Sequence, residues 1–183
     1  MIKQTPQSMV DVLALKRILI LNEAGDKVYV SSLWNSQSVV LVFLRHFGCI
    51  ACRAQIDQIM KNKTMLEKNG AKIIFIGNGP SAMIKAFKED LKIPHALIFT
   101  DPSLEVFDAC GFNRGLKYLV NAKTVMEGLK LYNEGYTQGI PTKATGSNLQ
   151  MGGIIAMKPP GIVTYHFASE YLGHFEDLNN IVE

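Results

Sequence analysis

The sequence is poor in cysteine, with only Cys49, Cys52 and Cys110 among its 183 residues. A count that is both low and odd excludes a small secreted scaffold built on disulfides. The length fits one domain, residues 1–183, which can bury its own core without a disulfide or a metal. Long apolar runs are also missing, because the longest covers residues 39–44 and roughly 18 are needed to span a bilayer. We therefore expect no membrane segment.

A large excess of positive or negative charge is missing as well. The net charge is only +3, which is too small to predict binding to nucleic acid. The first residues are polar and lead into no apolar signal segment, so we expect a cytoplasmic protein, provided that no leader was removed. A complete glycine-rich dinucleotide fingerprint is absent too, because residues 77–79, Gly-Asn-Gly, are only a fragment that a turn explains better.

Hydrophobic periodicity predicts strands that alternate with helices. Helical spacing follows Cys52 as far as about Gly70, and further helices are expected after Pro80, around residues 104–107 and at about 173–182. Apolar or alternating runs predict strands at residues 18–21, 27–30, 39–44, 72–77, 96–99, 154–157 and 162–167.

The order of these elements indicates an α/β fold of three layers. Two strands come first, then a β-α-β-α-β-α series, and a β-hairpin with a terminal helix closes the chain. An insertion at about 112–150 interrupts the series and holds a possible helix at 122–132 and a Gly/Thr/Pro-rich loop at 135–146. This layout is typical of a thioredoxin-like fold, with a central mixed sheet, an N-terminal hairpin and an insertion before the C-terminal hairpin.

Cys49 and Cys52 follow the most apolar predicted strand, where a helix begins. Sites in open α/β sheets gather at the carboxyl ends of strands. Free backbone N–H groups at a helix start lower the pKa of a thiol from about 8.5 to between roughly 3.5 and 7.5. We expect Cys49 to face solvent and to attack a peroxide or a disulfide. Cys52, one turn into the helix, should be more buried and should resolve the intermediate as an intramolecular disulfide.

Other interpretations of this segment stay open. The pair could be ordinary core cysteines, or it could join His46 as three ligands of a metal, although zinc sites of this kind usually need a second Cys/His pair. His46 could instead be a general base or a structural residue. The flanking Arg45 and Arg53 could stabilise a thiolate or be solvated surface charges.

The third cysteine, Cys110, precedes Gly111 at the end of a short predicted helix. We expect it to be a buried filler of the core. A role as an alternative resolving thiol is the other interpretation.

Residues 42–53, Val-Phe-Leu-Arg-His-Phe-Gly-Cys-Ile-Ala-Cys-Arg, resemble a branch of the peroxiredoxin-like proteins. These belong to the alkyl hydroperoxide reductase/thiol-specific antioxidant group of the thioredoxin superfamily, and the branch includes prostamide/prostaglandin F synthase-type proteins. Residues 111–114 and 145–153 look like the family's Gly-hydrophobic-x-Arg stretch and its Gly-rich approach to the hairpin. The resemblance covers nearly the whole chain. It implies a thioredoxin-like fold and dithiol redox chemistry.

The chain departs from this family pattern at two places. Ordinary peroxiredoxins carry Pro-x-x-x-Thr-x-x-Cys, whereas Val42 and His46 stand at the Pro and Thr positions here, so the hydroxyl that helps to orient a peroxide is absent. Thioredoxins place a cis-proline before the hairpin, whereas Gly152 and Gly153 stand in that stretch here. Glycine would allow the backbone of a substrate to approach closely.

We therefore predict a thiol-dependent oxidoreductase that reduces a peroxide, an endoperoxide or a disulfide. Cys49 would be the nucleophile and Cys52 the resolving thiol. No cofactor would be bound, and thioredoxin or glutathione would supply the electrons. The alternative is a redox-sensing or binding module without efficient turnover, with the insertion as its partner surface; the sequence leaves the oligomeric state open. The residues expected to stabilise the thiolate or bind substrate are Arg45, His46, Phe47, Gly48, Arg114, Gly152 and Gly153.

Overall fold

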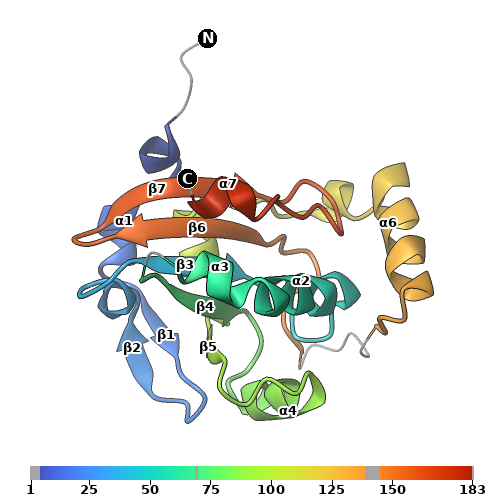
Figure 1. The fold of residues 1–183 in the computed structure, drawn as a ribbon, viewed down its shortest axis with the longest axis horizontal. Helices are drawn as coiled ribbons and strands as arrows, with labels where there is room; N and C mark the ends of the chain where they lie inside the picture. The colour runs from blue at the N-terminus through green and yellow to red at the C-terminus, as the bar shows by residue number, and fades with distance from the viewer. Residues whose placement is uncertain (1–4, 69, 139–144, 183) are drawn as a thin grey trace.

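A seven-stranded sheet forms the centre of the computed structural model, which describes residues 5–68, 70–138 and 145–182 (Figure 1). Its spatial order is β2-β1-β5-β4-β3-β6-β7. β3, β4 and β5 run parallel, and the other neighbours pair antiparallel, so the expected mixed sheet is confirmed. The strands are β1 (Leu19–Leu21), β2 (Lys27–Tyr29), β3 (Val39–Phe43), β4 (Lys72–Gly77), β5 (Leu97–Thr100), β6 (Gly153–Lys158) and β7 (Ile162–Ala168).

Helices cover both faces of the sheet and complete the three layers. One face carries α2 (Ile50–Lys61), α3 (Lys63–Leu66), α4 (Ala82–Asp90) and α7 (Asn179–Val182), and the other carries α1 (Val12–Leu15) and α5 (Glu105–Ala109). Every residue of β3 is buried. Val40 and Val42 pack into the core between the sheet and α2, and Val39, Leu41 and Phe43 pack into the core on the face covered by α1 and α5. Burial on both faces explains why β3 is apolar at every position.

The register of β3 fixes which segments meet at its carboxyl end. Phe43 pairs with Ile76 of β4 in parallel and with Gly153 of β6 in antiparallel. The segment that leaves β3 therefore lies beside the end of β4 and the start of β6. Chain segments more than 100 residues apart in sequence meet at this edge.

The helix after the cysteines ends earlier than the spacing predicts. It breaks at Asn62, so α2 and α3 are separate helices. The last helix is also shorter than expected, because α7 begins only at Asn179 rather than near Gly173. Gly173 adopts a left-handed conformation (φ 80°), and the Asp177 carboxylate accepts a hydrogen bond from the Asn179 N–H, which marks the helix start there.

The insertion lies between α5 and β6 (Figure 1). It contains a short 3-10 helix, η3 (Leu116–Tyr118), and the expected helix, α6 (Ala122–Asn133), which stands at the edge of the molecule. Part of the expected loop at 135–146 falls outside the described residues. Within the described ranges, no helix is long and apolar enough to cross a membrane.

Candidate active site

Cys49 is the N-cap residue of α2, and Cys52 lies in the first turn of that helix. The backbone of Cys49 is extended, and its carbonyl accepts the first helical hydrogen bond from the Arg53 N–H at 3.2 Å. The strand-to-helix junction predicted from the sequence therefore carries the pair.

The expectation that Cys49 faces solvent is wrong. Cys49 is completely buried and Cys52 is 2% exposed. Segments that follow α6 along the chain cover the junction, because the Ile50 N–H donates to Gln138 Oε1 at 3.0 Å and the Phe47 N–H donates to the Thr145 carbonyl at 3.0 Å. The Ile50 amide at the helix start is thus paired with a side chain from a distant part of the same chain.

Arg45 lies directly against the nucleophile position. Its Nη1 donates to Cys49 Sγ at 3.2 Å, and the side chain is buried. The other guanidinium nitrogens are held by backbone carbonyls, since Nε donates to Gln150 at 3.2 Å and Nη2 to Asn148 at 2.8 Å. Because carbonyls already hold two nitrogens of the planar guanidinium group, its side chain loses little further entropy when the third nitrogen donates to the sulfur.

The two thiols have opposite electrostatic settings. The hydrogen bond donated by Cys52 lowers the pKa of Cys49 well below its usual value, and the Arg45 charge adds to this effect against the cost of burial. Burial raises the pKa of Cys52 well above its usual value, and the bond that it donates to Cys49 raises it further. The Arg45 backbone N–H also donates to Cys52 Sγ at 3.1 Å. Cys49 is therefore the more readily ionised thiol.

His46 closes the turn between β3 and α2. Its Nδ1 accepts from the Gly48 N–H at 3.2 Å, and its carbonyl accepts from the Cys49 N–H at 3.2 Å. Burial lowers the pKa of the imidazole, the Cys49 charge raises it and the Arg45 charge lowers it. The ring is thus neutral at neutral pH, with its proton on Nε2 because Nδ1 is an acceptor.

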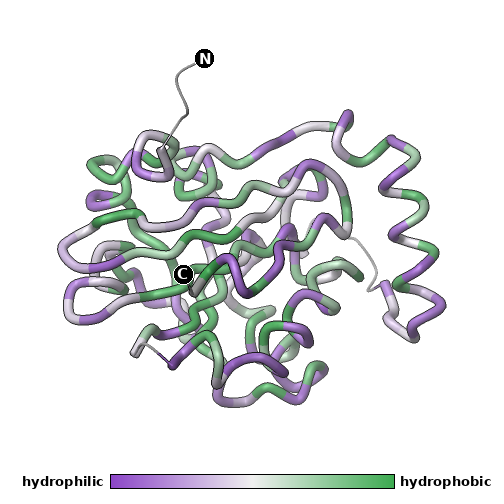
Figure 2. The backbone as a smooth tube through the Cα atoms, turned by 45° about the horizontal axis from the view of Figure 1, so that its top comes forward, coloured by the Kyte–Doolittle hydropathy of each residue, from purple (hydrophilic) through white to green (hydrophobic). Residues whose placement is uncertain are grey.

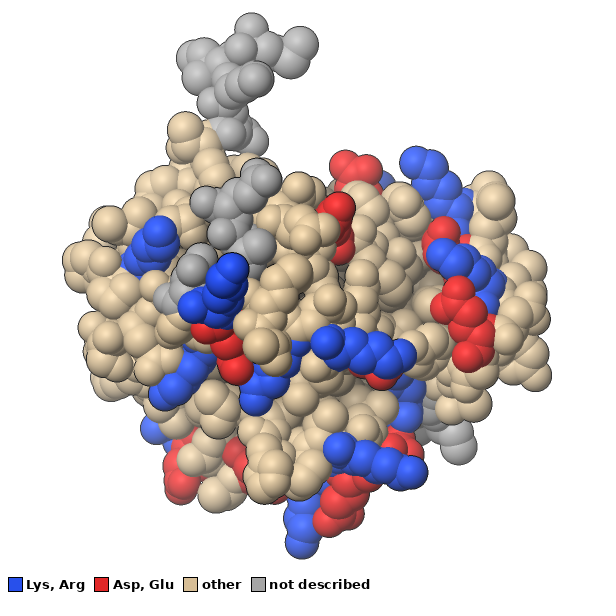
Figure 3. All heavy atoms as spheres, viewed as in Figure 1, with Lys and Arg blue, Asp and Glu red and all other residues tan. Residues whose placement is uncertain are grey.

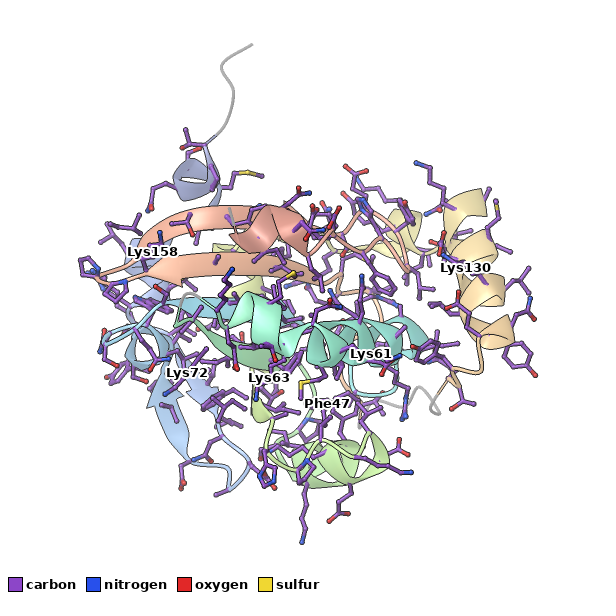
Figure 4. The ribbon with its side chains drawn as sticks, in the orientation of Figure 1. Phe47, Lys61, Lys63, Lys72, Lys130 and Lys158 are labelled. Atoms are coloured by element: carbon purple, nitrogen blue, oxygen red, sulfur yellow. The ribbon has the colours of Figure 1, made fainter. Side chains whose placement is uncertain are left out.

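Phe47 anchors the turn between β3 and α2 to the core (labelled in Figure 4). Its buried ring packs against Phe87 of α4, with centroids 5.0 Å apart. The ring also fills the space above two glycines, since a Cβ at Gly77 would lie 2.5 Å and one at Gly79 2.8 Å from its carbons. This packing places Phe47 in the same core cluster as the two thiols.

Arg114 reaches the site only indirectly. Its Nη2 pairs with Asp108 at 2.6 Å, and its Nε donates to Gln150 Oε1 at 2.7 Å. Because the Gln150 carbonyl accepts from Arg45, Arg114 connects to the dithiol through that glutamine. Arg114, which we expected to stabilise the thiolate or to bind substrate, is thus linked to Cys49 through Gln150 and Arg45.

Gly152 and Gly153 are needed by the chain's own packing. A Cβ at Gly152 would lie 2.2 Å from the Phe43 carbonyl oxygen, and one at Gly153 would lie 2.2 Å from the Phe112 ring. The space beside both glycines is therefore occupied by protein atoms rather than left for the backbone of a substrate.

The remaining candidates are separated from the thiolate. Arg53 points to α4, where it pairs with Asp90 at 2.5 Å. Cys110 is completely buried in the core cluster on the opposite face of the sheet from Cys49 and Cys52, and burial raises its pKa. This thiol is a core filler in the fold, as expected.

Sequence reasoning missed the amide side chains that hold the site together. Asn78 Nδ2 donates to the Arg45 carbonyl, and its Oδ1 accepts from the Ser147 N–H at 2.7 Å. The only signal was Gly77-Asn78-Gly79, which reads as a plain turn. Gln138 and Gln150 carried no signal, because their side chains accept from groups far away in sequence, Gln138 from the Ile50 N–H and Gln150 from Arg114 Nε. Among the residues that the structure describes, no group of three or more His, Cys, Asp or Glu is arranged to hold a metal ion.

Comparison with solved structures shows the fold. The bacterioferritin comigratory protein of Xanthomonas campestris, studied for alkyl peroxide reduction, superposes with a TM-score of 0.60 at 11% identity, over 85% of this chain and 82% of that one. Peroxidoxin BcpB of Mycobacterium tuberculosis gives 0.53 at 16% identity, over 85% and 83%.

Curated relatives are closer in sequence. The prostamide/prostaglandin F synthase of Salmo salar is 31% identical over 166 residues, 89% of this chain and 82% of that protein. The thioredoxin-like protein AAED1, chloroplastic, of Arabidopsis thaliana is 27% identical over 140 residues, 76% of this chain. This chain aligns with only 56% of the length of that second relative.

The family model described as AhpC/TSA antioxidant enzyme matches residues 58–170. The match begins after Cys52, so it covers the fold from the middle of α2 onward, and the two thiols lie just before it. Together with the relatives and the fold, it shows that this chain belongs to the AhpC/TSA family of the thioredoxin superfamily and is a peroxiredoxin-like, thiol-dependent oxidoreductase.

Proposed function

We propose that this chain uses the Cys49–Cys52 dithiol to reduce a peroxide, an endoperoxide or a disulfide, with Cys49 as the nucleophile. One observation carries the proposal: the buried Arg45 guanidinium lies 3.2 Å from Cys49 Sγ while Cys52 donates a hydrogen bond to the same sulfur. Two donors directed at one buried sulfur favour its thiolate, which is the reactive form of cysteine.

With a peroxide, the Cys49 thiolate attacks one oxygen of the O–O bond. The S–O bond forms, the O–O bond breaks, and the leaving alkoxide takes up a proton to become an alcohol. Cys49 is then a sulfenic acid, oxidised by two electrons. An endoperoxide would be opened at its O–O bond to leave Cys49 as a sulfenate ester of the product, and the attack of Cys52 would then release that oxygen as the second hydroxyl of a diol. A disulfide would instead give a mixed disulfide with Cys49 and release one thiol.

Cys52 would resolve the intermediate. Its sulfur attacks the sulfenic sulfur, the Cys49–Cys52 disulfide forms, and the hydroxyl leaves as water with the proton of the Cys52 thiol. Cys49 is the N-cap of α2 and Cys52 lies in its first turn, so the resolving step stays within one turn of the helix. Two thiols of an external reductant, from thioredoxin or glutathione, would then restore the dithiol and leave as a disulfide.

His46 would take the place of the missing threonine hydroxyl. Its Nδ1 accepts the Gly48 N–H, which leaves Nε2–H as the donor of the ring. A neutral donor can orient the peroxide oxygen without protonating the nucleophile.

A redox sensor with the same dithiol is the second candidate. The burial of both sulfurs beneath Gln138 and the segment around Asn148 favours it, because rapid turnover requires that a substrate reach Cys49. A sensor would form one disulfide per chain, and this disulfide would be reduced only slowly.

Turnover separates the two candidates. We expect the wild-type chain to consume many equivalents of a peroxide or of insulin disulfide in dithiothreitol, and Cys49→Ser to abolish this. Cys110→Ser serves as the matched control, since that thiol lies across the sheet and should leave turnover intact. Consumption that stops at one equivalent would reject the enzyme proposal in favour of the sensor.

A further inference from the structure

A narrow cavity reaches the dithiol from the side of Cys52. It lies between α2 and residues 169–175, which belong to the segment between β7 and α7, and its volume is about 20 Å³. Its described lining includes Cys52, Arg45 and Gln55 but not Cys49. The volume exceeds the roughly 10–15 Å³ that one water molecule needs and is far below that of a ligand pocket, roughly 300–1,000 Å³. The cavity can therefore admit one small group, such as a thiol, while the rest of the ligand stays outside.

Gln55 places an unpaired amide in the wall of this cavity. It follows Cys52 by three positions on α2, so the two side chains share one face of the helix, and it is only 6% exposed. Among the residues that the structure describes, its side-chain amide has no hydrogen-bond partner. Buried polar side chains are nearly always paired, so this amide is available to hold a polar group of a ligand.

The wall opposite α2 is held in place by its own hydrogen bonds and by α6. The His174 carbonyl accepts from Ser169 Oγ at 3.1 Å, and the Leu172 N–H donates to Thr124 Oγ1 of α6 at 3.2 Å. Figure 2 shows α6 at the edge of the molecule, with hydrophobic and hydrophilic residues in alternation along it. Because these contacts already order the wall, little entropy is lost in ordering it when a ligand enters.

Once the two cysteines are joined, their sulfurs differ as leaving groups. Arg45 Nη1 donates to Cys49 Sγ at 3.2 Å, and this donor stabilises a thiolate that is released at Cys49. In thiol–disulfide exchange, a sulfur of lower pKa leaves faster, and the pKa of Cys49 is the lower of the two. Attack on Cys52, the sulfur that the cavity reaches, therefore releases the better leaving group.

We propose, given the dithiol cycle proposed above, that this cavity admits a small peptide thiol that reduces the Cys49–Cys52 disulfide by attack on Cys52, while the Gln55 amide binds a carbonyl or carboxylate of that peptide. The reductant thiolate bonds to Cys52 Sγ, the bond between the two cysteines breaks, and Cys49 leaves as a thiolate. A second reductant thiolate attacks the sulfur of the first. Cys52 then leaves and takes up a proton, and the reductant leaves as its own disulfide.

A protein reductant fits this cavity less well. Cys52 is only 2% exposed, so an attacking cysteine would have to project well beyond the surface of its own protein. Basic and acidic side chains of the described residues are intermixed over the face that Figure 3 draws, so this face has no large region of one sign to steer a charged partner. A small and flexible thiol needs neither an exposed sulfur nor such steering.

The position of the mixed disulfide tests the attack on Cys52. The wild-type chain is oxidised to the Cys49–Cys52 disulfide, mixed with glutathione and stopped at early times in denaturant with N-ethylmaleimide. Tandem mass spectrometry of the peptide that carries both cysteines should find glutathione on Cys52 and N-ethylmaleimide on Cys49. Glutathione on Cys49 would overturn this assignment and leave the proposed function intact, whereas a chain that forms no Cys49–Cys52 disulfide would overturn both.

Gln55→Leu tests the amide. Loss of one hydrogen bond should slow reduction of the disulfide by glutathione about 3- to 10-fold, and reduction by 2-mercaptoethanol, which has no amide or carboxylate, should stay within about twofold of wild type. Gln58→Leu makes the same change on the same helix outside the cavity and should alter neither rate. The proposal would be overturned by an unchanged rate with glutathione, by equal slowing with both thiols, or by faster reduction with thioredoxin than with glutathione at equal thiol concentration.

Discussion

At the residue scale, Arg45 joins the nucleophile to the chain segment that precedes β6. Its guanidinium contacts Cys49 and the carbonyls of Gln150 and Asn148, and its backbone contacts Cys52. The arginine thus orients both thiols from one position. A lysine could supply the charge there, but it could not hold three partners in one plane.

Replacing this guanidinium should impair the nucleophile. We expect Arg45→Met to raise the pKa of Cys49 toward its ordinary value and to lower kcat/KM about 10- to 100-fold, because one charge-assisted hydrogen bond is worth about 1.5–3 kcal/mol. Arg53→Met, at the other flank of the pair, removes a charge that pairs with Asp90 and should change kcat/KM less than about twofold. Equal losses in the two variants would count against a specific role for Arg45.

The lowered pKa of Cys49 also sets the pH dependence of its reactivity. Only the thiolate is alkylated, so the midpoint of the rate against pH should lie well below the value of about 8.5 for a free thiol. Iodoacetamide labelling at Cys49, followed by peptide mass spectrometry, gives the profile. In Arg45→Met the midpoint should move upward, and a wild-type midpoint near pH 8.5 would show that the site does not activate the thiol.

At the element scale, the chain that follows α6 acts as a strap across the start of α2. We define the strap as residues 135–138. Its Tyr136 hydroxyl donates to Asp57 Oδ2 at 2.6 Å, and its Gln138 side chain accepts from the Ile50 N–H. The bond to Asp57 raises the pKa of Tyr136 to about 12, so the phenol keeps its proton and the contact persists across the physiological range.

Loosening the strap should expose the nucleophile. Tyr136→Phe removes one hydrogen bond worth about 1 kcal/mol, so the alkylation rate of Cys49 should rise about 2- to 10-fold. Tyr29→Phe is the matched control, because Tyr29 is half-exposed on β2 at the far edge of the sheet. An unchanged rate in Tyr136→Phe would mean that access to Cys49 follows another route.

The glycines before β6 should prove essential for folding. Gly152→Ala would place a Cβ 2.2 Å from the Phe43 carbonyl oxygen, and we expect it to lower the free energy of unfolding by roughly 2–4 kcal/mol in urea denaturation. Gly128→Ala offers a comparison of opposite sign. Its Cβ would meet only Leu172, at 3.8 Å, and alanine should stabilise α6 by about 0.5–1 kcal/mol. A Gly152→Ala variant as stable as wild type would require a rearranged β3–β6 contact.

Local signals predicted most of these elements. The apolar run of β3, the helical spacing of α2 and α6, and the position of the cysteines at a strand-to-helix junction all depend on neighbours in sequence. The start of α7 was predicted too early, because the backbone at Gly173 and the capping bond from Asp177 outweigh the apolar spacing. Periodicity contains no information on such caps.

At the scale of the whole molecule, the parts that could not be predicted are contacts between distant segments. Arg45 lies 105 positions before Gln150 and 103 before Asn148. The pairing of β3 with β6 brings them together. The burial of Cys49 has the same origin, because the cover comes from Gln138 and the Thr145 carbonyl. From the sequence alone, the start of a helix is expected to be exposed, because the residues that cover it are distant along the chain.

The sheet also separates the three cysteines by function. Cys49 and Cys52 lie in the core cluster on one face, and Cys110 lies in the cluster on the other. Oxidation should therefore stay within the pair on the first face, provided that the chain remains folded.

Mass spectrometry after one equivalent of peroxide tests the central claim most directly. The wild-type chain should lose two hydrogen atoms and give a peptide with Cys49 linked to Cys52. Cys52→Ser, treated with dimedone, should carry the sulfenic acid adduct on Cys49. An adduct on Cys52 in Cys49→Ser at the same rate, or a disulfide that includes Cys110 in the wild type, would contradict the assignment of Cys49 as the nucleophile and Cys52 as its resolving partner.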